Sequence, residues 1–120
     1  MATMSDNLTA INNLWGSELT IYDQSVYGTQ ARQSYPLVYS SITRVEGESS
    51  RTTRGTYTAM LLVSVAGNSN PGSTARTYLE GFLTAIRPVG NILDGSVSVE
   101  EVTIQGAYGF RLEVPFLVQR

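Results

Sequence analysis

The chain has 120 residues and a mass of 13.1 kDa, which is the size of one domain, and 42% apolar residues suffice for a packed core. Only 15% of the residues are charged and the net charge is −2, so there is no basic stripe for sequence-specific binding to nucleic acid. The chain contains no Cys, His or Lys, which excludes thiolate nucleophiles, Ser–His relays, Schiff bases and the usual zinc and copper ligands.

The N-terminal segment predicts a short amphipathic helix followed by a strand. Apolar side chains recur at helical spacing on one face, at Leu8, Ile11, Leu14 and Trp15. The candidates for the N-cap, each with a side-chain oxygen for an unpaired N–H, are Ser5, Asp6 and Asn7. We expect the helix to end at Gly16, a strand over 19–22 and a polar surface loop over 23–34.

Two longer strands are predicted next, over 37–45 and 56–66, with the most polar stretch of the chain between them. The second strand alternates, but Met60 and Leu62 make its other face apolar as well, so we expect cover on both faces there. Residues 46–55 hold two Glu, two Arg and no apolar side chain, which indicates a polar loop or hairpin arm. This arm is either a solvated hairpin tip or a contact for a partner.

The clearest periodic pattern predicts a helix that begins at Pro71, with Asn70 as its N-cap, and stops at Arg87-Pro88. Its apolar stripe consists of Ala75, Tyr78, Leu79, Phe82, Leu83 and Ile86. We expect this stripe, with Leu83 near its middle, to pack in the core. The stretch 67–74 has P-loop spacing but carries Ser73 at the lysine position, so it is interpreted as a capped strand-to-helix loop.

The C-terminal third predicts a pair of strands joined by a turn over 105–109. The apolar residues of 97–104 change parity at Glu100–Glu101, which predicts a β-bulge. Inward-facing residues of the last strand are Phe110, Leu112, Val114, Phe116 and Val118. Because Pro115 has no N–H to donate, we expect a sheet edge beside it.

The order of elements, α-β-β-β-α-β-β, predicts one α+β domain over residues 1–120, with an arm at about 46–55. We expect a mainly antiparallel sheet of about four to five strands with two helices packed on one face. The longest uninterrupted apolar run, 59–63, is too short to span a bilayer, and no signal-peptide pattern is visible. We therefore expect no membrane partner.

No catalytic, cofactor-binding or metal-binding residue is predicted. The adjacent carboxylates of Glu100 and Glu101 would come together only in a bulge, and a solvated pair is favoured over a glycoside-hydrolysing pair. Tyr57 and Tyr78 lie on apolar faces and are expected in the core. The tyrosines that are candidates for an interface are Tyr22, Tyr27, Tyr35, Tyr39 and Tyr108.

Three segments together carry a family resemblance: the strand TYTAMLLVSVAG, the helix STARTYLEGFLTAIRP and the closing strands SVSVEEVTIQGAYGFRLEVPFLVQR. In length and order of elements, the chain resembles the tail terminator, or tail completion, proteins of long-tailed bacteriophages. The resemblance covers nearly the whole chain and rests on architecture rather than on a residue motif. It implies a small α+β subunit that assembles into a ring, commonly a hexamer.

The resemblance further implies a virion structural protein that is not an enzyme and needs no cofactor. Its ring would sit at the head-proximal end of the tail, end tube polymerisation and join the tail to the head. The implied partners are other copies of the chain, the tail tube protein and the head-side connector, with assembly in the host cytoplasm. Candidate interface residues are Glu46, Glu48, Arg51 and Arg54. The alternatives are a neck or head-completion connector subunit and, in a different class, a small carboxylate-based enzyme or ligand-binding domain.

Overall fold

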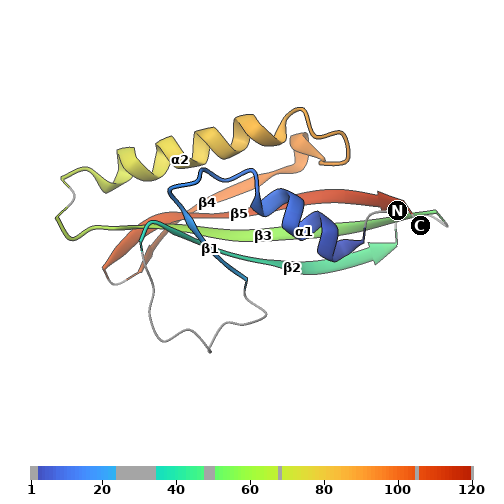
Figure 1. Ribbon diagram of the computed structural model, residues 1–120, viewed down its shortest axis with the longest axis horizontal. Coiled ribbons are helices and arrows are strands. Elements are labelled where there is room, and N and C mark those ends of the chain that lie inside the picture. Colours follow the sequence, from blue (N-terminus) through green and yellow to red (C-terminus); the bar gives the residue numbers. More distant parts are fainter. Residues whose placement is uncertain (1–2, 24–34, 48–50, 68, 105, 120) are drawn as a thin grey trace.

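The computed structural model describes residues 3–23, 35–47, 51–67, 69–104 and 106–119. The elements are α1 (Met4–Asn12), β1 (Thr20–Asp23), β2 (Leu37–Gly47), β3 (Thr52–Ser64), α2 (Pro71–Ile86), the 3-10 turn η2 (Asp94–Ser96), β4 (Ser98–Ile104) and β5 (Ala107–Gln119). Two helices cover one face of a mostly antiparallel five-stranded sheet, which confirms the predicted α+β class (Figure 1). Most of the predicted loop 23–34 and Tyr27 lie outside the described residues.

The strands follow the order β1-β2-β3-β5-β4 across the sheet. Among the described strands, only β1 and β2 pair in parallel, and the other neighbouring pairs are antiparallel. The two central strands, β3 and β5, have 13 residues each and pair along their full length. Because a strand rises about 3.3 Å per residue, this central pair makes the molecule elongated, with extents of 51 × 31 × 22 Å.

The main core fills the space between the helices and the sheet. Alternate residues of the central strands point toward the helices, as the sequence predicts, and Tyr57 is among them. The fully buried side chains from β2, β3 and β5 on this face include Val38, Tyr57, Ala59, Leu61, Leu112, Val114 and Phe116. The helices contribute Ile11, Ala75, Leu79, Phe82 and Ile86.

Helix α2 begins and ends where the sequence predicts. The Asn70 side chain accepts from the backbone N–H of Ser73 at 3.1 Å, and Pro71 occupies the first turn, where no partner for its nitrogen is needed. The part of the P-loop-like stretch that the structure describes, residues 67 and 69–74, therefore leads from β3 into the capped start of α2, as predicted. Leu83 differs from the prediction, because it is only partly buried at the side of the stripe, whereas Phe82 is 1% exposed.

Helix α1 starts earlier and ends earlier than predicted. Its N-cap is Thr3 rather than Ser5, Asp6 or Asn7: the Thr3 hydroxyl accepts from the Asp6 N–H, and the Asp6 carboxylate accepts from the Thr3 N–H. This reciprocal pairing is a capping box, which satisfies the backbone N–H groups of both Thr3 and Asp6 at the start of the helix. The helix ends at Asn12, so Trp15 follows it in a turn instead of forming its last apolar position.

A chain of hydrogen bonds ties the end of α1 to β3 inside the core. The indole Nε1–H of Trp15 donates to the Tyr57 hydroxyl at 3.0 Å, and that hydroxyl donates to Asn12 Oδ1 at 2.7 Å. The Trp15 ring also stacks on Phe82 of α2, with ring centroids 3.9 Å apart. Burial raises the pKa of Tyr57 to about 12. Trp15 thus joins both helices and the sheet.

Candidate assembly surface

The predicted arm at 46–55 is a hairpin end rather than a long loop. Glu46 and Gly47 continue β2, Thr52 begins β3, and Glu46 pairs in register with Arg54. Polar residues can extend the strands here because the hairpin is exposed and its two strands are joined by backbone hydrogen bonds, which do not require apolar side chains. The strand bounds leave residues 48–51 between β2 and β3. Glu48 lies outside the described residues, so its predicted place at an interface has no structural account.

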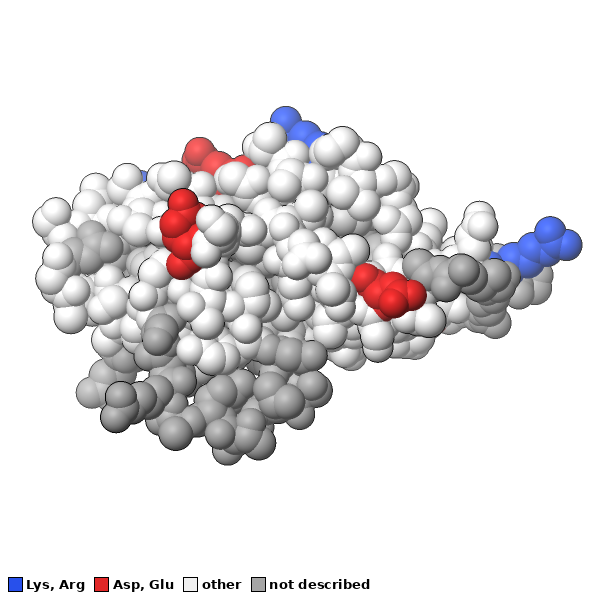
Figure 2. Space-filling view, in the orientation of Figure 1, with Lys and Arg blue, Asp and Glu red and all other residues white. Residues whose placement is uncertain are grey.

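Arginine side chains are concentrated at this hairpin end. We call the described segments 44–47 and 51–54 the arginine hairpin, which contains three arginines, Arg44, Arg51 and Arg54, and one glutamate, Glu46. The side chains of Arg44, Glu46 and Arg51 are exposed, and that of Arg54 is half-buried. Figure 2 shows basic atoms at the extreme end of the molecule, where Figure 1 places the end of β2 and the start of β3. A contact between this hairpin and another subunit remains a prediction.

At the opposite side of the sheet, β4 is an edge strand with exposed carboxylates. Its register with β5 runs without a shift from Ser98 to Ile104, so the predicted bulge at Glu100–Glu101 is wrong. The two carboxylates therefore point to opposite faces, which removes the geometric basis for a paired-carboxylate site. A bulge does occur elsewhere, in β2 between Ile42 and Arg44, where sequence parity gave no signal.

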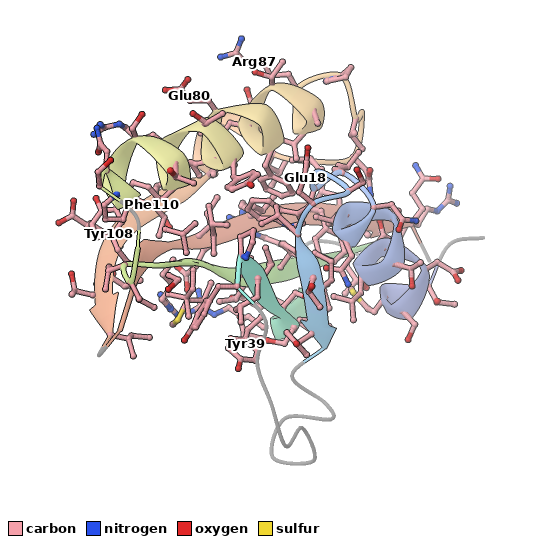
Figure 3. All side chains as sticks on the ribbon, turned by 60° about the vertical axis from the view of Figure 1, so that its left-hand side comes forward. Glu18, Tyr39, Glu80, Arg87, Tyr108 and Phe110 are labelled. Atoms are coloured by element: carbon pink, nitrogen blue, oxygen red, sulfur yellow. The ribbon has the colours of Figure 1, made fainter. Side chains whose placement is uncertain are left out.

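Glu101 has a specific partner across the ladder. Its carboxylate accepts from the Tyr108 hydroxyl at 2.7 Å, and this hydrogen bond to a negative group raises the pKa of Tyr108. Tyr108 in turn packs edge-on against Phe110, with centroids 5.8 Å apart (Figure 3). Tyr108, an interface candidate from the sequence, is thus half-buried and held by its own sheet.

The expected sheet edge beside Pro115 is only partly correct. The edge strand β4 starts at the partner of Glu113 and does not reach Pro115, as the missing N–H requires. However, the backbone N–H of Leu93 donates to the Pro115 carbonyl at 2.9 Å, and Ile92 forms a bridge with Phe116. The segment before η2 therefore closes this position, and β5 is a central strand.

The sheet face without helices carries a second apolar cluster. Leu37, Tyr39, Leu62 and Ala107 are buried in it, with Tyr22, Met60 and Val102 packed around them. The Tyr22 and Tyr39 rings lie 5.5 Å apart, and Figure 3 shows Tyr39 pointing away from the helices. The predicted apolar character of both faces of β3 is confirmed, and Tyr39 is a packing residue of this cluster.

A shallow pocket of about 590 Å³ lies near the start of α1, lined in part by Asn7, Asn91 and Leu117. Its amides already pair, since Asn91 Nδ2 donates to Asn7 Oδ1 at 2.7 Å and to the Leu117 carbonyl at 3.1 Å. The side-chain amide of Asn91 therefore offers no free donor to a ligand in this pocket. Among the described residues, no group of three or more acidic side chains could hold a metal ion.

No helix in the described part of the chain is both long enough and apolar enough to cross a membrane. A comparison with known protein families finds no family that matches the chain, and no curated protein sequence matches it significantly.

Proposed function

We propose that this protein is a virion structural subunit that forms a ring, most simply a hexamer, on the head-proximal end of a bacteriophage tail tube. In this role the ring ends tube polymerisation and presents a surface to the head-side connector. The tail tube protein, the connector and other copies of the chain are its partners.

One observation carries the proposal: the helices cover one face of the sheet, while strand edges on both sides carry exposed apolar residues. Val45 near the hairpin end is 59% exposed, and Val99 and Ile104 on β4 are 43% and 44% exposed. Large apolar side chains beside open strand edges favour contacts with other protein chains. A subunit with different open surfaces on its two sides suits head-to-tail association, which closes into a ring when the rotation allows it.

The test is electron microscopy of particles from the phage that encodes the chain, with a small tag on the protein and gold-labelled antibody. We expect label only at the junction of tail and head. A tagged tail tube protein is the matched control, because it should label the whole tube. Label on the head alone would favour the neck or head-completion alternative, and a tail end without label would contradict the terminator function.

Deletion of the gene gives an independent readout. If the ring stops the tube, particles without this protein should show tail tubes of irregular, extended length that are not joined to heads. Tubes of normal length joined to heads would contradict the proposal. An enzyme would instead change the turnover of a substrate, and the protein itself would not be present at the tail end.

A further inference from the structure

The outer edge of β4 is an open strand edge among the described residues. No described strand pairs with this side of β4, and six of its seven residues are exposed, Val102 being the exception. Two of the exposed side chains are the apolar Val99 and Ile104. An edge strand of this length with open N–H and C=O groups is a template for pairing with another chain.

The charges on β4 oppose its pairing with β4 of a second copy. Glu101 is the middle residue of the strand, so a fully overlapped antiparallel pair about a two-fold axis would place it opposite its own counterpart. Like charges directly opposite each other destabilise a strand pair. Because β4 carries no basic residue to compensate, a cationic surface on a different part of the second copy complements it better than β4 itself.

The arginine hairpin has the complementary features. Only Leu37–Ser40 of β2 pair with β1, so no described strand pairs with the outer side of the remaining residues, Ser41–Gly47. This edge also has seven residues, like β4. The hairpin carries three arginines and one glutamate in its described segments, whereas β4 carries two glutamates and no basic residue.

The charged residues of the two edges also lie on the same face of the sheet. Arg44 pairs with Thr56 and Glu100 pairs with Arg111, and by strand alternation both pairs lie on the face without helices. In a ring each copy turns the same face in the same direction. A sheet that continues from one copy to the next therefore brings Arg44 and Glu100 to one surface, and Val45 and Val99 to the other.

We propose that the arginine hairpin of one copy docks on the β4 edge of the next copy, head to tail, and that this contact closes the ring. The inference rests on the proposed ring function. The ion pairs between the two edges make association dependent on salt and select the heterologous contact over a symmetric β4–β4 dimer.

Charge reversal tests the contact, measured by sedimentation velocity up to about 1 mM chain, a concentration that detects even weak association. We expect Arg44→Glu or Glu100→Arg alone to weaken association at least about tenfold, and the two together to restore most of it. The matched controls are Glu80→Arg and Arg87→Glu, whose side chains point outward from α2 (Figure 3) and should change association less than about twofold. Circular dichroism verifies that each variant is folded.

Disulfide trapping gives a second readout, which the absence of native cysteine makes unambiguous. A Val45→Cys/Val99→Cys variant should give a ladder of multimers on oxidation, since each copy carries both halves of the contact. Val45→Cys with Val65→Cys is the control pair and should give no ladder, because Val65 follows the opposite end of β3.

Three results overturn the docking: wild-type chain that stays monomeric at about 1 mM, rings with neither charge rescue nor a ladder, or dimers linked through Val99→Cys alone. Rings built through another surface would overturn the docking but leave the proposed function intact. A ladder and charge rescue in a protein that is missing from the tail end would support the docking and contradict the proposed function.

Discussion

Removal of the Tyr57 hydroxyl should destabilise the fold more than loss of one oxygen atom suggests. The side chain is 0% exposed, and its hydroxyl receives the indole N–H of Trp15 while donating to Asn12. In Tyr57→Phe the ring stays in place, but the N–H of Trp15, itself only 6% exposed, loses its partner. A buried unpaired donor costs about 1–3 kcal/mol, and Asn12 loses a further bond worth about 1 kcal/mol. We expect the free energy of unfolding to fall by about 2–4 kcal/mol.

The measurement is urea unfolding followed by far-UV circular dichroism, because the single tryptophan is part of the cycle and cannot serve as the probe. Trp15→Phe completes a double-mutant cycle. Trp15→Phe removes the donor that Tyr57→Phe leaves unpaired. The double variant should therefore lose about 1 kcal/mol less stability than the sum of the two single variants. A loss below about 0.5 kcal/mol for Tyr57→Phe, or additive costs, would refute the hydrogen-bonded link between α1 and β3.

Three further predictions concern packing and pH. In urea unfolding, Phe82→Ala should cost about 3–5 kcal/mol and the half-buried Leu83→Ala less than about 2, and the reverse order would contradict the orientation of α2. Gly109→Ala should cost at least about 3 kcal/mol, because the added Cβ would lie 1.6 Å from the Leu61 carbonyl oxygen. Gly81 is exposed and has open space around it, so Gly81→Ala should stabilise α2 by about 0.5–1 kcal/mol in thermal unfolding. Since burial raises the pKa of Tyr57 from 10.0 to about 12, the neutral phenol stabilises the fold fully below pH 10, and this contribution, about 2–3 kcal/mol, is lost as the pH rises toward 12. Stability of the wild type should therefore fall more steeply above pH 10 than that of Tyr57→Phe, and parallel curves would contradict the burial.

Helix α2 could be predicted closely because its signals are local. Asn70 and Pro71 set its start through side-chain and backbone geometry, and the 3.6 period identifies the buried face. The boundary of that face was less accurate, as Leu83 shows. When the apolar stripe of a helix is wider than its contact with the sheet, the residues at the edges of the stripe stay half-buried. The width of that contact depends on which strands the helix packs against.

The strands that carry the interface candidates could be predicted only in part. The polar composition of 46–55 predicts a loop or a hairpin arm, and the structure shows the hairpin, with Arg54 already inside β3. Composition does not distinguish an exposed strand from a loop, because ladder hydrogen bonds are made by the backbone of either kind of residue. The change of parity among its apolar neighbours predicts a bulge at Glu100–Glu101, which the structure does not have. On an edge strand exposed on both faces, that parity carries no information about burial.

The sequence alone determined the α+β class, the order of the elements and the inward residues of β3 and β5, because periodicity and capping are written in neighbouring residues. Only the tertiary structure decided that β5 inserts between β3 and β4, which leaves β4 as the open edge on that side. It also decided that the arginine hairpin and the carboxylates of β4 lie on opposite sides of one sheet. Strand order depends on contacts between residues tens of positions apart, and the energies of those contacts are not encoded in any local pattern.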